Sequence, residues 1–119
     1  MPISDDYLHF MEDQLEGLPE LTHRRIFGGA GLYSEGFFFA VLDDDTLYLK
    51  VSDLTRPDFE KAGMGALDPH GDPDRSLRGY YQVPPQVVEN RDALRVWAEK
   101  AVQASRRAAA ADTGGSRGC

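Results

Sequence analysis

The sequence predicts an α+β fold, a two-layer sandwich in which helices lie against a mostly antiparallel sheet. Between Arg24 and Val51, aromatic and β-branched runs are interrupted by glycine-rich or aspartate-rich turns, as in antiparallel strands joined by tight connections. A helical apolar periodicity precedes this region and another follows it near the C-terminus. Grouped strands with helices at both ends are typical of this class. The expected element order is α-β-β-β-α-β-β-α.

Length and cysteine content predict one domain without disulfides. A chain of 119 residues can bury one hydrophobic core but not two, so we expect a single domain over residues 1–111. The stretch 112–119 is rich in glycine and is expected to be a flexible tail. Cys119 is the only cysteine, which excludes a disulfide within the chain and a zinc site built from cysteines.

The charge balance bears on partners and location. The formal net charge is −7, from 13 basic and 20 acidic residues, and it disfavours direct binding to DNA or to an anionic membrane. The N-terminus lacks a secretory signal, and no stretch is apolar enough to span a membrane. We therefore expect a cytoplasmic protein. Residues 91–119 are net basic, in contrast to the acidic residues 1–22.

The first predicted element is an amphipathic helix from about Asp5 to Glu16. Ser4 is a good N-cap, because its hydroxyl can accept a hydrogen bond from the first turn. Gly17 and Pro19 are expected to end the helix. Apolar side chains at spacings of three and four form its buried stripe: Leu8, Met11, Leu15 and Leu18.

The aromatic region predicts three antiparallel strands. Glu35-Gly36 and Asp43-Asp44-Asp45 are expected to form hairpin turns. The glycine segment 28–31 is expected to form a bulge or tight turn within the first strand. The strands then cover residues 24–27 continued by 32–34, residues 37–42, and residues 46–51.

The middle strand is apolar on both faces. A period of two places Phe37, Phe39 and Val41 on one face and Phe38, Ala40 and Leu42 on the other. On the next strand, Leu47, Leu49 and Val51 alternate with Tyr48 and Lys50. Helices can cover one of the two faces, so the other needs a cover of its own.

The remaining elements are a short helix, a loop with weak strand signals and a long helix. Thr55 and Asp58 predict a capping box for a helix from about Arg56 to Ala62. Gly65 to Ser76 predicts a loop, with a short strand near 66–68, and Leu77 to Val83 predicts a strand that Pro84-Pro85 stops. Asn90 is expected to cap the last helix, whose buried stripe includes Trp97.

No motif predicts catalysis, a metal or a cofactor. The glycine spacings fit neither dinucleotide-binding nor Walker loops, because Ser34 and Phe37 stand where glycine and lysine are required. The aspartate triplet lacks calcium-loop spacing, and the histidines lack ligand spacing. No serine or cysteine lies in a nucleophile motif. We therefore expect a protein that is not an enzyme.

The second apolar face of the sheet is the candidate interaction surface. Aromatic side chains ringed by cations are typical of protein interfaces, although each cation taken singly could instead belong to the polar edge of a sheet. The partner expected there is a protein, with a second copy of the chain as one option. The candidate residues are Arg25, Phe38, Leu42, Tyr48, Lys50, Arg56 and Tyr80.

Two other functions remain open. The last helix could contact DNA through Arg91, Arg95, Arg106 and Arg107, as part of a transcription-linked module. The chain could also bind, or act on, a small molecule in a pocket that the sequence does not reveal.

A set of spaced motifs resembles the N-terminal domain of the TfoX/Sxy family. The matching pieces run from Arg25-Ile26-Phe27-Gly28-Gly29-Ala30-Gly31-Leu32-Tyr33, through Leu47-Tyr48-Leu49-Lys50-Val51 and Tyr80-Tyr81-Gln82-Val83-Pro84, to Leu94 with Trp97-Ala98. The positions that the resemblance marks as structural are Phe27, Gly28, Gly29, Gly31, Tyr33, Tyr81, Pro84 and Trp97.

The resemblance implies a fold similar to type III secretion chaperones and a regulatory role. Full-length family members are positive regulators of DNA-uptake competence genes, acting with a cyclic-AMP-responsive transcription activator. Their second, helical domain has no counterpart in this sequence, so a competence role does not carry over directly. The segment Gly65 to His70 also departs from the aromatic segment that the family has after the middle helix.

Overall fold

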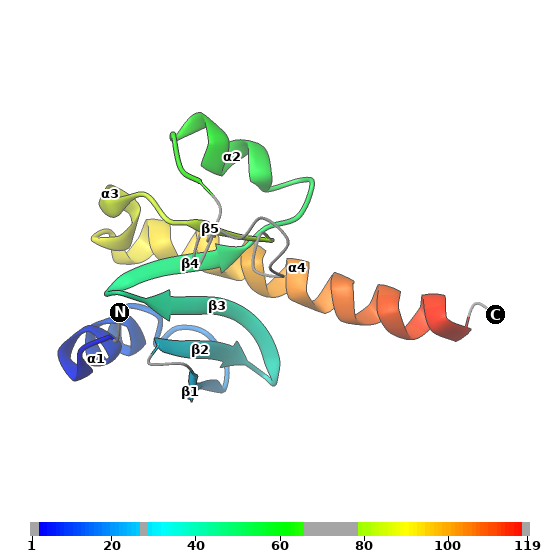
Figure 1. Ribbon diagram of the computed structural model, residues 1–119, viewed down its shortest axis with the longest axis horizontal. Helices are drawn as coiled ribbons and strands as arrows, with labels where there is room; N and C mark the ends of the chain where they lie inside the picture. Colours follow the sequence, from blue (N-terminus) through cyan, green and yellow to red (C-terminus); the bar gives the residue numbers. More distant parts are fainter. Residues whose placement is uncertain (1–2, 27–28, 66–78, 118–119) are drawn as a thin grey trace.

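A computed structural model describes residues 3–26, 29–65 and 79–117 of the chain. Its strands pair in the order β1-β2-β3-β4-β5, and each neighbouring pair is antiparallel (Figure 1). The elements are α1 (Asp5–Gln14), β1 (Leu21–Ile26), β2 (Gly29–Ser34), β3 (Phe37–Asp43), β4 (Thr46–Lys50), α2 (Arg56–Lys61), β5 (Tyr80–Gln82), α3 (Pro85–Val88) and α4 (Arg91–Arg117).

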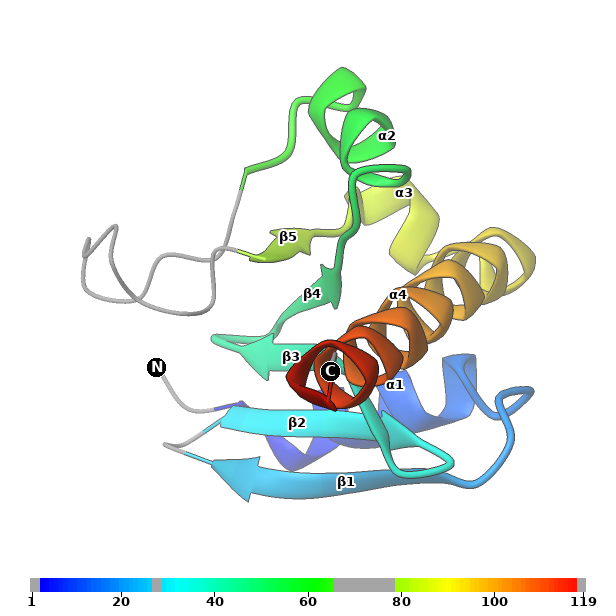
Figure 2. The same cartoon turned by 90° about the vertical axis from the view of Figure 1, so that its right-hand side faces the viewer.

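The main core lies between the helices and one face of the sheet, which confirms the α+β class. Figure 2 shows the sheet curving around α4, with β1 and β2 below the helix and β4 and β5 beside it. The C-terminal half of α4 projects beyond the sheet (Figure 1). The fully buried members of this core include Met11 of α1 and Leu15 just after it, Leu32, Phe39, Leu42 and Leu49 of the sheet, and Leu94 and Ala98 of α4.

The two long helices begin where the sequence predicts. The Ser4 hydroxyl accepts a 3.1 Å hydrogen bond from the backbone N–H of Tyr7, and Asn90 Oδ1 accepts one of 3.0 Å from the N–H of Ala93. The predicted capping box of α2 is wrong. Thr55 Oγ1 instead accepts the N–H of Ser52 at 2.9 Å, because the chain makes a tight turn before the helix begins.

The glycine segment was expected to interrupt one strand, but it begins a separate one. β1 runs from Leu21, and its partner β2 already begins at Gly29, with Ile26 opposite Gly29. Strands β1 to β4 therefore precede α2, where the sequence predicted three. Phe27 and Gly28 lie outside the described residues.

The alternation predicted for β3 is broken by a β-bulge. Leu32 pairs with Ala40 and Tyr33 pairs with Phe38, so Phe39 and Ala40 together oppose Leu32. Phe39, Ala40 and Leu42 all join the main core, whereas Phe38 and Val41 lie on the opposite face. The expected grouping of Phe38 with Leu42 is therefore wrong.

The last third of the chain differs in detail from the prediction. The strand predicted over 77–83 is described as β5 (Tyr80–Gln82), and the short strand expected near 66–68 falls outside the described residues. Pro84 ends β5 as expected, and the one-turn helix α3 follows it. The α4 backbone continues to Arg117, past the boundary expected at Ala111.

Candidate interaction surface

The sheet face opposite the main core carries an ordered set of aromatic side chains. Cross-strand pairing places Tyr33 beside Phe38, and Lys50 beside Tyr80. The neighbouring row across the sheet holds Arg24, Gly31, Val41, Tyr48 and Gln82, each paired with the next. We call Tyr33, Phe38, Val41, Tyr48 and Tyr80 the aromatic face.

Ring contacts join three strands across this face. The ring centroids of Tyr33 and Phe38 lie 5.1 Å apart, and those of Phe38 and Tyr80 lie 5.4 Å apart. Lys50 Nζ lies 5.3 Å from the centroid of the Tyr80 ring, within the range of a cation–π contact. Such contacts hold the rings in a defined arrangement and add stability beyond the burial of their area.

The aromatic face is only partly open to solvent. Val41 and Tyr80 are 5% and 6% exposed. Phe38 and Tyr48 are partly buried and pack against them, and Tyr33 and Lys50 are also half-buried. The part of the face that a partner can reach is therefore formed by the edges of the half-buried rings together with the Lys50 ammonium group.

Gly31 allows the Phe38 ring to lie across β2. A Cβ atom at this position would lie 2.8 Å from Phe38 Cε1, which is closer than real Cβ contacts. The absence of a side chain at Gly31 therefore creates the space that the ring fills. This contact gives a physical reason for glycine at one of the positions that the family resemblance marks as structural.

Burial raises the pKa of two tyrosines on this face, Tyr80 and Tyr48. The pKa of Tyr80 is raised to about 12, mainly by burial and secondarily by the Tyr33 phenol. The pKa of Tyr48 is also raised, by burial first and then by the carboxylates of Asp43 and Asp44. The neutral phenol is therefore the stable form of Tyr48 and Tyr80 throughout the physiological range.

We expect the free energy of unfolding to fall as the pH rises from 10 towards about 12, because tyrosines ionise near 10 in the unfolded chain whereas Tyr80 resists ionisation in the native state. Alkaline unfolding of wild-type protein and of Tyr80→Phe, followed by circular dichroism, measures this contribution. The variant should lose less stability than wild type over this interval. Equal slopes would contradict the raised pKa.

Three predicted members of the surface lie elsewhere. Leu42 is fully buried in the main core because of the bulge in β3. Arg25 faces α1, where its Nη2 lies 2.5 Å from Asp5 Oδ1, and Arg56 Nη1 donates to Asp53 Oδ1 at 2.9 Å. In place of Arg25, the sheet pairing brings Arg24 onto the row with Val41 and Tyr48.

Three family-motif residues, Trp97, Tyr81 and Pro84, pack on the helical side of the sheet. Trp97 packs edge-to-face on Phe59 with centroids 4.8 Å apart, and Tyr81 contacts the same ring at 5.9 Å. Pro84 is fully buried. Trp97 is thus mainly a packing residue, as its place on the apolar stripe predicts, although part of its ring remains accessible.

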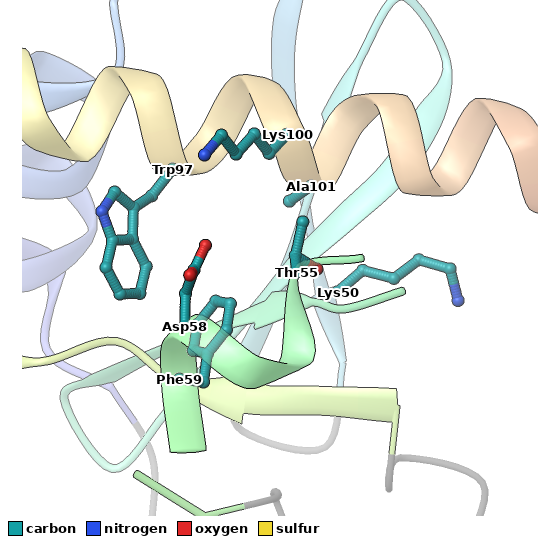
Figure 3. A pocket seen from close by; sticks show the side chains of 7 residues that line it. All are labelled: Lys50, Thr55, Asp58, Phe59, Trp97, Lys100 and Ala101. Atoms are coloured by element: carbon teal, nitrogen blue, oxygen red, sulfur yellow. The ribbon is translucent and has the colours of Figure 1, made fainter. Parts of the chain in front are cut away.

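The hollow between α2 and α4 is too small for an organic ligand. Figure 3 shows Trp97 and Lys100 of α4 above Asp58 and Phe59 of α2. Its volume is about 10 Å³. That is close to the space of a single water molecule. The hollow therefore adds no support for a small-molecule site.

The aspartate triplet forms a turn that is tied to α1. Asp44 and Asp45 have φ angles of 52° and 51°, as a tight hairpin of this kind requires. Asp45 Oδ1 accepts the backbone N–H of Ser4 at 2.9 Å. Within the part of the chain that the structure describes, no three His, Cys, Asp or Glu side chains are grouped to hold a metal ion.

Acidic side chains engage most of the arginines proposed to contact DNA. Arg91 donates to Asp13 Oδ2 at 3.0 Å and to Glu16 Oε1 at 2.9 Å, which joins α4 to α1. Arg95 pairs with Glu99 at 3.3 Å within α4. Arg106 binds Glu35 in the β2–β3 turn and lies 5.2 Å from the centroid of the Phe37 ring. This pairing reduces the positive potential available to a phosphate backbone.

Comparison with known families identifies the fold. Residues 13–105 match the model of the TfoX N-terminal domain, which is most of the 119-residue chain. The chain belongs to the TfoX N-terminal domain family. Comparison with curated proteins gave no match. The matched span contains the whole aromatic face of this TfoX N-terminal domain, and among its described helices none is long and apolar enough to cross a membrane.

Proposed function

We propose that this TfoX N-terminal domain is a non-enzymatic, cytoplasmic regulatory module that binds a protein partner through its aromatic face. The observation that carries the proposal is the contact series Tyr33–Phe38–Tyr80 with Lys50 over the last ring. Protein interfaces are enriched in aromatic residues at the centre and in cations that stack on them. The regulatory role follows from the family, whose full-length members regulate competence and transcription.

The partner can be a second copy of the chain or another protein, and the same surface serves both. The pairing of Arg91 and Arg106 with acids favours protein over DNA as the target. The net charge of −7 supports the same choice. A role in transcription would then come from contacts with other regulatory proteins.

We expect Lys50→Glu to weaken partner binding, because it removes the cation over Tyr80 and places an acid beside the rings. Affinity capture from the native cytoplasm, compared between wild type and the variant, measures binding to other proteins. Sedimentation equilibrium over a range of concentrations measures self-association. Lys100→Glu is the matched control, because it makes the same charge change at an exposed position of α4.

The proposal predicts that wild type either captures a protein or self-associates. That binding should be reduced in Lys50→Glu and unchanged in Lys100→Glu. The aromatic face would be excluded as a binding surface if wild type stayed monomeric at all concentrations and captured no protein whose binding depends on Lys50. A salt-dependent gel shift with DNA that Arg107→Ala abolishes would favour the DNA-contact alternative instead.

A further inference from the structure

A groove lies at one end of the sheet, away from the Tyr33–Phe38 end of the aromatic face. Figure 1 shows α1, α3 and the β3–β4 turn together at this end of the molecule. The groove has a volume of about 290 Å³. That is close to the lower limit of ordinary binding pockets. Its lining comes from these three regions and from β4 and β5, and it includes Tyr7, Phe10, Asp45, Leu47, Val83 and Glu89.

The groove has an apolar floor and an exposed aromatic rim. Leu47 and Val83 are 1% and 2% exposed and belong to the main core. Tyr7 and Phe10 lie one turn apart on α1, with ring centroids 6.2 Å apart. Phe10 is 40% exposed, which makes it one of the large apolar side chains that the fold leaves open to water. Phe10 lines the groove and also remains open to water, so an extended occupant covers more of this ring than a small molecule held at the floor.

The charge around the groove is negative. Among the residues that the structure describes, its lining contains the carboxylates Asp45 and Glu89 and neither lysine nor arginine. Asp6 lies one turn before Phe10 on α1. The cation nearest in sequence to Glu89 is Arg91, and its guanidinium group already donates to the carboxylates of Asp13 and Glu16.

The raised pKa of Tyr7 is consistent with the negative charge around the groove. Its pKa is raised to about 12 by burial first, then by Asp45 and by Tyr48. A carboxylate that disfavours a nearby phenolate favours a cation at the same place.

We propose that this groove binds a basic, apolar segment of a protein partner. An apolar side chain of the segment rests on Phe10 and the floor at Leu47, and a neighbouring lysine or arginine reaches Glu89 and Asp45. The inference rests on the proposed function only in that the occupant is a protein. It concerns a second surface, and the partner chemistry is set by charge complementarity and by the exposed Phe10 ring.

Titration with a defined peptide tests the proposal. The probe is an amidated hexapeptide of alternating leucine and lysine, and its control has glutamate in place of lysine. Amide resonances in two-dimensional NMR report where each peptide binds. We expect the lysine peptide to shift resonances of groove residues, and its affinity to fall about fivefold in Phe10→Ser and in Glu89→Lys. The matched controls Leu54→Ser and Glu60→Lys alter an exposed apolar residue and an exposed acid elsewhere, and should bind as wild type does.

Three outcomes would overturn the proposal. The first is equal binding of the glutamate peptide, and the second is a set of shifts outside the groove that Phe10→Ser and Glu89→Lys do not alter. The third is binding of n-hexylamine as tight as that of the peptide, which would assign the groove to small amines. Lys50→Glu is expected to leave peptide binding unchanged. A loss confined to Lys50→Glu would place the peptide on the aromatic face and would leave the proposed function standing without the groove.

Discussion

Replacing Phe39 by alanine is expected to lower the free energy of unfolding by about 3–5 kcal/mol, the cost typical of deleting a fully buried phenyl ring. Phe39 is 0% exposed and lies in the main core between the sheet and the helices. Small domains are stable by only about 5–15 kcal/mol. The variant should therefore unfold at a much lower urea concentration than wild type, with a similar dependence on denaturant.

Phe38→Ala is the matched comparison, because it removes the same ring from the preceding residue. Phe38 lies on the opposite face and is only partly buried, so its removal should cost less, about 1–2 kcal/mol. Urea unfolding of both variants measures the difference. If the cost at Phe38 equalled or exceeded that at Phe39, the bulge would not have the position described.

Elements specified by local chemistry could be predicted from the sequence. A hydroxyl or amide side chain ahead of a periodic apolar stripe indicates a helix start, and both Ser4 and Asn90 make the expected caps. The turn at Glu35 and Gly36 follows in the same way from glycine at a left-handed position, with φ angles of 52° and 85°. These features depend on residues a few positions apart, so they can be recognised without knowing the fold.

Features that depend on pairing between strands could not be predicted. The three consecutive phenylalanines of β3 are apolar on either face, so the pattern carries no signal for the bulge at Phe39. The pairing register of β1 with β2 decides whether Arg24 or Arg25 faces α1, and a shift of this register by one residue would exchange them. The groove beside Phe10 unites α1, β5 and α3, which no local pattern brings together.

The candidate interaction surface contains residues that the sequence placed correctly and residues that it placed wrongly. Tyr48, Lys50 and Tyr80 occupy the face predicted from the alternation of β4, because that strand has regular pairing with both neighbours. The prediction put Leu42 and Arg25 on the wrong face, because it lacked the bulge in β3 and the register of β1 with β2. The aromatic character of the face could thus be predicted from the sequence. Which residues lie at its margin could not, because that depends on the register of the whole sheet.

Gly31→Ala should have opposite effects on stability depending on the residue at position 38. In the wild-type background the new Cβ would lie 2.8 Å from Phe38 Cε1. Tyr33 and Tyr80 flank the Phe38 ring, with centroids 5.1 Å and 5.4 Å away, which limits its movement. We expect a loss of about 1–3 kcal/mol, the usual cost of overpacking.

In a Phe38→Ala background the same substitution should be neutral or stabilising by about 0.5–1 kcal/mol, because alanine loses less backbone entropy than glycine when a strand forms. A double-mutant cycle by urea unfolding measures this coupling between the two positions. Gly36→Ala in both backgrounds is the control: its φ of 85° makes the substitution costly for a reason that does not involve Phe38. An equal cost of Gly31→Ala in both backgrounds would show that glycine is needed there for something other than the Phe38 ring. A reversal of sign would establish that this glycine sets the position of the ring at the centre of the aromatic face.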